Sequence, residues 1–477
     1  MIGPICRQAI VCRGCICALL VFFCAHALGQ VPEAAPLPLW TILIFMNGDN
    51  NLEPDALMNF RQLASVDSSP DVNVIVQFDR FGFGKYATTT PDWSQTLRFQ
   101  VKKGTQPLPS FAVQDIGEAD MGDPQVLADF VKWGKASYPS QHYMLVIWDH
   151  GQGWRFFTAA LQQKAQAMVA SRALHVGDTA QTQLAFSASL RTGYAKADAK
   201  GHTAPLTSAP GDGYRSASND ETDQDVLYDR EIEDGLKSAL GGIHLDVIGF
   251  DACLMGMLET GYALRDVADN LVGSEELEPG PGWKYDDLLK HIETAKPVDG
   301  RALAAIVVSS YQNAYEITEP DTTLSAISLT NIKGVATSVS SLADQMSLRL
   351  PQNISAVTAA RKATSTYAPG KQFYHVDIVE FLDQLIAHNP DQGIKSAAVA
   401  ASRSVKDSVF ANYAGSDRQG TYGSAGLAIY FPATNTDHVN DPYAEGGYEK
   451  DNTYYPVEFV QDFHWADFLH SYWSSVP

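Results

Sequence analysis

The stretch LDVIGFDAC, residues 245–253, is an apolar run that ends in an aspartate and a cysteine. A continuous apolar run of this length predicts a strand buried on both faces, as in a parallel sheet that is covered by helices. The same pattern occurs in three earlier stretches, WTILIFMN (40–47), VNVIVQFD (72–79) and YMLVIWDH (143–150). These four runs predict the central strands of one sheet.

Helical patterns lie between the predicted strands. The stretch NLEPDALMNFRQLASV, residues 51–66, has an asparagine cap and an early proline, both typical of a helix start. Other helices are expected at residues 124–137, 229–240 and 254–268, and other strands in NLVGSEE (270–276), TLSAISL (323–329) and AGLAIYFP (425–432). Strands that alternate with helices predict an α/β sandwich with a mainly parallel sheet.

The chain of 477 residues is too long for one ordinary core, so the sequence predicts two structural units. We expect an α/β domain over residues 38–330 and a smaller, mostly helical C-terminal subdomain over residues 331–477. AGLAIYFP is the candidate for a strand that returns from this subdomain to the first sheet. An irregular insertion at about residues 162–225 interrupts the α/β domain, and its basic residues are Lys164, Arg172, Arg191, Lys196, Lys200 and Arg215.

Residues 1–27 have the pattern of a secretory signal peptide. Arg7 and Arg13 precede an apolar stretch at residues 16–23, and Ala25-His26-Ala27 offers the small residues that signal peptidase accepts. The apolar stretch is too short to span a bilayer, which takes about 20 residues, and no later segment is suited to anchor the chain. We therefore expect a secreted or periplasmic protein with a cleaved signal peptide and no stable membrane anchor.

Removal of the signal peptide would leave Cys253 as the only cysteine, because the other five lie within the first 24 residues. A lone thiol in an exported protein indicates a reactive nucleophile, an intermolecular bridge or a buried core residue. The formal net charge of −21 becomes −23 when the two arginines of the signal peptide are removed. Such an acidic chain is poorly suited to bind nucleic acid or anionic membranes.

Reactive side chains follow two of the predicted strands. In an α/β sheet the carboxyl ends of the strands gather the chemistry, and here one strand leads to His150 and Gly151 while another ends at Cys253. An imidazole activates a thiol as base and as electrostatic partner. Gly151 lets the backbone approach a substrate carbonyl, so that its N–H and that of Cys253 form an oxyanion hole. The residues predict a Cys-His dyad, against the alternative of a structural histidine and a turn glycine.

Four motifs resemble the clostripain family of cysteine endopeptidases, relatives of caspases, gingipains and legumains. They are IFMNGDNNLE (44–53), VIWDHGQGW (146–154), DVIGFDACLMGMLETGYAL (246–264) and SEELEPGPGW (274–283), and the resemblance runs from about residue 40 to residue 329. It implies a caspase-like α/β/α sandwich and hydrolysis of protein or peptide substrates after Arg or Lys. It also implies a thioester acyl-enzyme on Cys253, with His150 as catalytic partner and Gly151 at the oxyanion.

The resemblance assigns substrate binding to Asp251. Family members have an aspartate at this position, and it binds the charged side chain of the Arg or Lys that precedes the cleaved bond. A carboxylate at the floor of a narrow pocket suits guanidinium and ammonium groups. The alternative is that Asp251 caps the helix expected near residue 254. Trp283 is expected to line the pocket beside the methylene stem of the substrate. Candidate second acids are Glu275, Glu276, Glu278 and Asp286.

The chemistry of a Cys-His dyad requires no cofactor, but a calcium site is an open alternative. The founding member of the family uses calcium, and NDETDQD, residues 219–225, concentrates oxygen ligands without the glycine of an EF-hand loop. Some relatives are zymogens that cut themselves between the two dyad residues, so self-processing is also left open. Two other functions remain, a catalytically silent surface binding protein and a peptidase with a different preference. The sequence predicts no oligomeric state.

Overall fold

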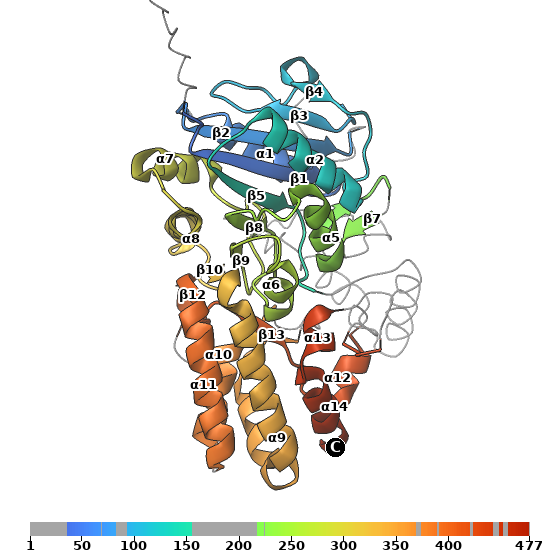
Figure 1. Ribbon diagram of the computed structural model, residues 1–477, viewed down its shortest axis with the longest axis vertical. Helices are drawn as coiled ribbons and strands as arrows, with labels where there is room; N and C mark the ends of the chain where they lie inside the picture. The colour runs from blue at the N-terminus through green and yellow to red at the C-terminus, as the bar shows by residue number, and fades with distance from the viewer. Residues whose placement is uncertain are drawn as a thin grey trace, which may run out of the picture. The chain divides into compact units, whose positions relative to one another are not determined.

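A nine-stranded sheet forms the centre of the computed structural model (Figure 1). The structure describes residues 36–67, 69–82, 93–154, 217–223, 225–368, 374–388, 391–419, 423–441, 448–451 and 457–476. Five neighbouring strands are parallel, namely β9 (Asn270–Gly273), β8 (Val247–Asp251), β5 (His142–Trp148), β1 (Trp40–Gly48) and β2 (Val72–Arg80). The edges are antiparallel, with β3 (Leu97–Gln100) and β4 (Gln114–Asp115) beside β2, and β10 (Thr323–Ser328) and β12 (Val409–Ala414) beside β9.

The central strands are buried on both faces, and alternate side chains enter two separate cores. On β1, Leu43 and Phe45 join one core, while Ile42 and Ile44 join the other. The first core is covered by α2 (Pro124–Ser137), α5 (Asp229–Leu240) and α6 (Leu258–Leu264), and the second by α1 (Glu53–Leu63), α7 (Tyr285–Ala295) and α8 (Gly300–Tyr315). The three layers confirm the predicted α/β/α sandwich with a mainly parallel sheet.

The chain beyond β10 is mostly helical. It forms α9 (Leu329–Ala363), α10 (Ile378–His388), α11 (Gln392–Ser408), α12 (Asn435–Val439), α13 (Glu458–Asp462) and α14 (Trp465–Ser475). Helices α9, α10 and α11 pack against one another (Figure 1), and side chains from α9, α10, α11 and α14 extend the first core. Residues Leu37–Pro477 form one compact unit. The division into a domain over 38–330 and a subdomain over 331–477 stays a prediction.

Three local predictions are wrong, each for a physical reason. Helix α6 begins at Leu258 rather than at residue 254, because Leu254 has a φ of 61°, a left-handed conformation that an α-helix excludes. Helix α1 has Leu52 rather than Asn51 at its N-cap, because the first helical hydrogen bond runs from the Ala56 N–H to the carbonyl oxygen of Leu52 at 2.9 Å. Residues of AGLAIYFP form β13 (Ala428–Tyr430), which pairs with β11 (His375–Asp377) and not with the large sheet.

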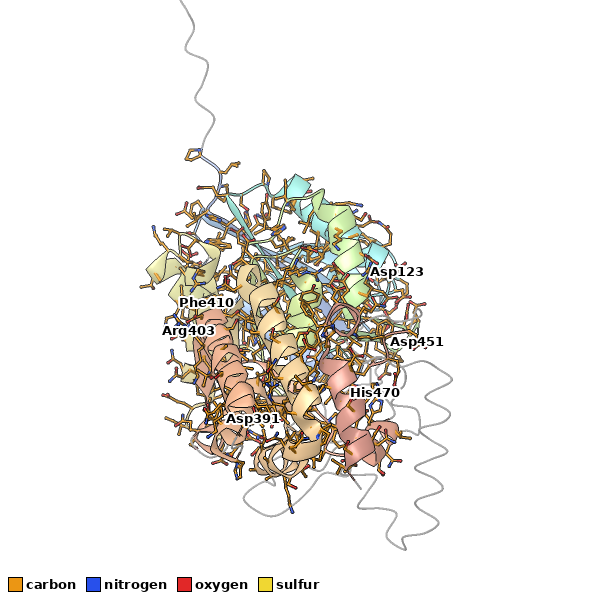
Figure 2. All side chains as sticks on the ribbon, turned by 60° about the horizontal axis from the view of Figure 1, so that its bottom comes forward. Asp123, Asp391, Arg403, Phe410, Asp451 and His470 are labelled. Carbon is orange, nitrogen blue, oxygen red and sulfur yellow. The ribbon has the colours of Figure 1, made fainter. Side chains whose placement is uncertain are left out.

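Aspartates cap helix α2, which the sequence predicts, and helix α11. The Asp123 carboxylate accepts from the backbone N–H of Gln125 at 2.7 Å, and that of Asp391 accepts from the N–H of Ile394 at 3.0 Å. Figure 2 labels both aspartates, at the starts of α2 and α11. Each carboxylate satisfies an N–H that the first turn leaves without an intrahelical partner, so these starts are fixed locally.

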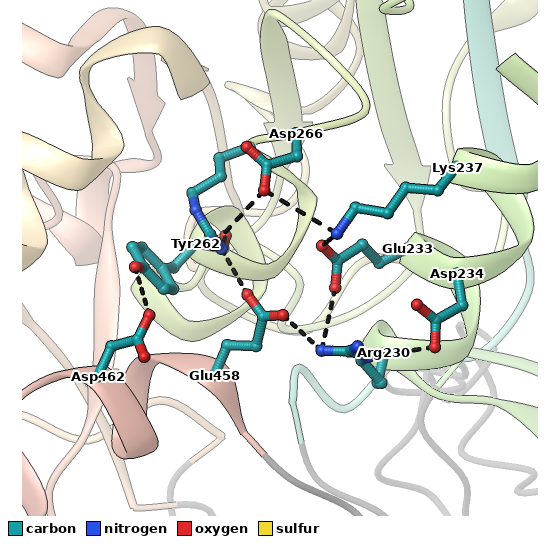
Figure 3. A network of polar contacts seen from close by, with 9 residues as sticks. Arg230, Glu233, Asp234, Lys237, Tyr262, Asp266, Glu458 and Asp462 are labelled. Carbon is teal, nitrogen blue, oxygen red and sulfur yellow. Dashed lines mark hydrogen bonds and ion pairs between the residues drawn. The ribbon is translucent and has the colours of Figure 1, made fainter. Parts of the chain in front are cut away.

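A polar network ties α13 to the helices that flank β8 (Figure 3). Glu458 pairs with Arg230 of α5 at 2.5 Å and with Arg265, just after α6, at 2.6 Å. Tyr262 of α6 donates to Asp462 at 2.8 Å, and burial raises the pKa of this tyrosine. The last part of the chain is thereby fixed to the layer that supports the strand leading to Cys253.

Two predicted segments lie wholly or largely outside the described residues. These are the signal peptide, residues 1–27, and the insertion with all of its basic residues. The end of the insertion is ordered rather than irregular, since β6 (Ala217–Asp220) and β7 (Asp225–Leu227) form an antiparallel hairpin. No helix within the described ranges is both long and apolar enough to cross a membrane.

Candidate active site

The two predicted dyad residues lie beyond neighbouring strand ends. Strands β5 and β8 are parallel, and Trp148 stands opposite Asp251 in their register. His150 and Cys253 each follow this pair by two residues. The sheet therefore brings both to the same edge, as the sequence predicts.

Gly151 packs directly on the backbone of Cys253. A Cβ atom added at Gly151 would lie 2.3 Å from the carbonyl oxygen of Cys253 and 3.0 Å from its nitrogen, closer than real Cβ contacts allow. Only glycine fits here. The loop after β5 and the loop after β8 are thus in contact at the residues that the sequence assigns to the oxyanion.

His150 is buried, and its Nε2 atom lies 2.8 Å from Oδ1 of Asn51. Asn51 precedes α1 and belongs to the motif IFMNGDNNLE, but the sequence analysis assigned it only as the cap of that helix, a position that the structure gives to Leu52. The motif shows only that polar residues follow β1. It does not show which of them reaches the histidine, because that depends on the path of the turn.

The thiol of Cys253 is also buried and contacts the loop that follows β9. Its Sγ atom accepts from the backbone N–H of Glu278 at 3.3 Å. Burial raises the pKa of Tyr311 well above its usual value, and the charges of Glu278, Cys253 and Asp251 add to the effect. Tyr311 therefore lies close to Cys253, Glu278 and Asp251.

Asp251 is held by the same loop. Its Oδ1 accepts from the backbone N–H of Trp283 at 3.1 Å, and its Oδ2 accepts from the hydroxyl of Tyr285 at 2.8 Å. The cap interpretation is wrong, because α6 begins at Leu258 with no side-chain cap. Asp251 thus orients the loop that covers Cys253.

Trp283 lies in the second core rather than at an accessible surface. It is 1% exposed, and its ring sits under Gly249 of β8, where an added Cβ would come within 2.7 Å of the indole. A role beside the substrate stem stays a prediction, and it requires the loop to move.

The four candidate second acids occupy different surroundings. Glu275 accepts from the N–H of Gly426 at 3.0 Å, and Glu276 forms an ion pair with Arg418. Asp286 pairs with Lys290 at 2.8 Å near the surface. Among the four, Glu278 is the one whose backbone contacts the thiol, and its side chain is buried.

Six carboxylates gather beyond the ends of β1 and β2 in two groups of three. The oxygens of each group lie within 4.8 Å of one another, and the members are Asp49, Asp79 and Glu118, then Asp120, Asp220 and Asp223. Burial raises the pKa of Asp220 to about 7 and that of Asp49 to about 6, and neighbouring carboxylates add to both shifts. Oδ2 of the buried Asp79 has no hydrogen-bond partner among the described residues.

The predicted oxygen-rich segment contributes to one of these groups. Asp220 and Asp223 both come from NDETDQD, which forms the β6–β7 hairpin. Asp49, Asp79, Glu118 and Asp120 were missed, because they come from three separate parts of the chain, namely the turn after β1, the end of strand β2 and the loop after β4. Asp49, Asp79 and Asp220 are buried, Asp120 is half-buried, and Glu118 and Asp223 are exposed. Carboxylate oxygens that converge in this way fit a hard cation such as calcium.

The fold and the paired strand ends define a class of α/β/α proteins that includes solved C11 proteases. One is a secreted C11 cysteine protease from Bacteroides thetaiotaomicron in complex with an irreversible peptide inhibitor, at 15% identity. Another is an inactive zymogen C11 protease from Parabacteroides distasonis, at 17% identity. Both have a TM-score of 0.53, and the similarity covers 91% of this chain and 99% of theirs.

Sequence comparison gives the family. The model of the clostripain family matches residues 44–172 and 207–473, so the chain belongs to the clostripain family, as its motifs predict. Clostripain of Hathewaya histolytica is 27% identical over 270 residues, which is 53% of this chain. The match spans 42% of the length of that relative.

Proposed function

We propose that the protein is an exported cysteine endopeptidase in which Cys253 is the nucleophile and His150 its partner. The observation that carries the proposal is the contact between Gly151 and Cys253, which joins the two loops at one edge of the sheet. A silent binding protein of the same fold would have no need to keep a histidine and its only mature thiol at this contact.

The chemistry follows from these groups. His150 takes the proton of the thiol, and the thiolate attacks the carbonyl carbon of the scissile peptide bond. The N–H groups of Gly151 and Cys253 stabilise the oxyanion. His150 then protonates the leaving amine, and water hydrolyses the thioester. The loop at Glu278 covers the thiol, so it must shift when substrate binds.

A panel of fluorogenic peptides that end in Arg, Lys, Asp or Asn tests this function. We expect hydrolysis after Arg and Lys and little after Asp or Asn, because the groups around the thiol are acids. Hydrolysis after Asp or Asn would favour a peptidase with a different preference. No hydrolysis, together with slow alkylation of Cys253 by iodoacetamide, would favour the binding protein.

Substrate preference is proposed to rest on Asp251, with Glu278 as the second acid. Asp251→Asn keeps the shape of the side chain but removes its charge. We expect kcat/KM for Arg and Lys peptides to fall about ten- to a hundredfold, since a charge-assisted bond contributes roughly 1.5–3 kcal/mol. The amide can still accept from the Trp283 N–H and donate to the Tyr285 hydroxyl, so the loop over Cys253 should keep its place and the iodoacetamide rate at Cys253 should stay within about threefold of the parent.

Asp286→Asn is the matched control, because this carboxylate pairs with Lys290 near the surface. It should leave kcat/KM unchanged. If Asp251→Asn cuts after Arg as fast as the parent, Asp251 is not the recognition group, and Glu278→Gln becomes the variant to measure.

Self-processing within the insertion is also proposed. The insertion begins beyond His150 and ends before β8, so cleavage there would divide the chain between the two dyad residues. We expect the parent to accumulate two fragments, split after one of Arg172, Arg191, Lys196, Lys200 or Arg215, while the Cys253→Ala protein stays whole. Intact mass measurement distinguishes the two. A fully active parent that remains one chain would refute self-processing.

The acid groups beyond β1 and β2 are proposed to hold calcium. Its ligands would be carboxylate oxygens of Asp49, Asp79, Glu118, Asp120, Asp220 and Asp223, and its positive charge would offset the repulsion between them. The hairpin that carries Asp220 also pairs with the histidine loop, through a bridge between Gly151 and Ala217. These residues would thereby couple calcium binding to the order of that loop.

Thermal unfolding tests the calcium site without an activity assay. We expect about 1 mM calcium to raise the Tm of the parent, because an ion that binds only the native state adds roughly 2.7 kcal/mol at a hundredfold excess over its Kd. Asp220→Asn should lose most of this shift, whereas the exposed Asp67→Asn should keep it. A parent Tm that calcium does not change would refute the site.

A further inference from the structure

We propose that Asn51 is a positioning residue that holds the imidazole of His150 in the tautomer and orientation needed to deprotonate Cys253. The inference rests on the proposed function, because it concerns the base of that reaction. Asn51 touches His150 and is not itself proposed to touch substrate.

The hydrogen bond between the two side chains decides the tautomer. The contact joins His150 Nε2 to the side-chain carbonyl oxygen of Asn51 at 2.8 Å. A carbonyl oxygen only accepts, so Nε2 carries a proton. In the neutral ring the lone pair is then on Nδ1. Proton exchange with the thiol therefore falls to Nδ1.

Asn51 can orient the histidine because the turn that carries it is tied down on both sides. Before it, Asn50 donates from Nδ2 to the Asp149 carboxylate and to the carbonyl oxygen of Asn219, each at 2.8 Å. After it, the buried Leu52 donates its N–H to Asn50 Oδ1. The turn after β1 is thus fastened to the residue that precedes His150.

The start of α1 adds rigidity to the same turn. Glu53, directly after Leu52, is buried and forms an ion pair with the buried Arg80 at 2.6 Å. Asn51 itself is exposed. Its truncation should therefore leave the network of Asn50, Glu53 and Arg80 in place and cost little stability.

The same hydrogen bond should widen the pH range of activity. An acceptor at Nε2 favours the imidazolium, and the imidazolium favours the thiolate of Cys253. Without the acceptor, the pKa of the thiol rises, which moves the acid limb of the pH profile to higher pH. The pKa of the imidazolium falls, which moves the alkaline limb to lower pH. The other ionisable groups near the site, Asp149, Asp251 and Glu278, are unchanged in such a variant.

Two substitutions at Asn51 separate orientation from general stability. We expect Asn51→Ala to lower kcat about ten- to a hundredfold with little change in KM. The pH profile for alkylation of Cys253 by iodoacetamide should become narrower. Asn51→Asp keeps an acceptor and adds charge, so it should recover much of the activity and move the alkaline limb to higher pH.

Gln106→Ala is the control. It truncates an exposed amide that donates to the nearby carbonyl oxygen of Gly104 and not to a residue of the site. Its kcat and its alkylation profile should match the parent. Coincident profiles for Asn51→Ala and the parent, at comparable Tm, would overturn the proposal. A different experiment tests the proposed function itself: if the Cys253→Ala protein still hydrolyses peptides, that function is wrong whatever the Asn51 variants show.

Discussion

Replacing Cys253 by alanine should lower peptide hydrolysis by a factor of about 10⁴ or more. In the proposed reaction the thiolate of Cys253 forms the covalent bond to the substrate, and no other group can replace it. His150→Ala should give a comparable loss, since members of a dyad act as a unit. Initial rates on an Arg-ending fluorogenic peptide measure both effects.

The fold of the Cys253→Ala protein should survive. The side chain is fully buried, so loss of the sulfur leaves a small cavity at a cost of roughly 1 kcal/mol. Circular dichroism and Tm measure this control. Substantial hydrolysis by a well-folded alanine protein, free of contaminating protease, would show that Cys253 is not the nucleophile.

Gly151→Ala should remove most activity although both dyad side chains remain. The added methyl group would lie 2.3 Å from the carbonyl oxygen of Cys253, so one of the two loops must move. A displacement of about 1 Å in a reacting group can cost about a hundredfold in rate. We expect kcat/KM to fall at least that far, with slower alkylation of Cys253.

Gly334→Ala is the matched control for this substitution. Gly334 lies in α9, and an added Cβ would meet nothing within 4 Å. The control should keep full activity and gain about 0.5–1 kcal/mol of stability, because alanine favours the helix over glycine. A Gly151→Ala protein as active as the parent would refute the close packing of the two loops.

Much of the sheet could be predicted because its signals are local. The apolar runs of β1, β2, β5 and β8 need burial on both faces, and that need is visible in each run by itself. Helices α2 and α5 match their predicted bounds. The antiparallel edge formed by β10 and β12 could not be predicted, because pairing between distant strands leaves no local pattern.

For the candidate site, the positions of the two dyad residues were predictable, but the contacts around them were not. The alternation of strands and helices places His150 and Cys253 at strand ends, and the parallel sheet then makes them neighbours. The contacts of Asp251 with Trp283 and Tyr285 could not be foreseen, because they depend on how a proline- and glycine-rich loop folds back. For the same reason the sequence could not separate Glu278 from Glu275 and Glu276.

Covalent labelling with a peptidyl acyloxymethyl ketone that ends in lysine tests the central claim most directly. This reagent alkylates a thiolate that is positioned to attack the carbonyl of a bound peptide. We expect one adduct per chain, located on Cys253 by peptide mapping, with parallel loss of hydrolysis. The His150→Ala protein should label far more slowly. Full loss of hydrolysis with the adduct on another residue, or persistent hydrolysis with Cys253 fully modified, would contradict the assignment.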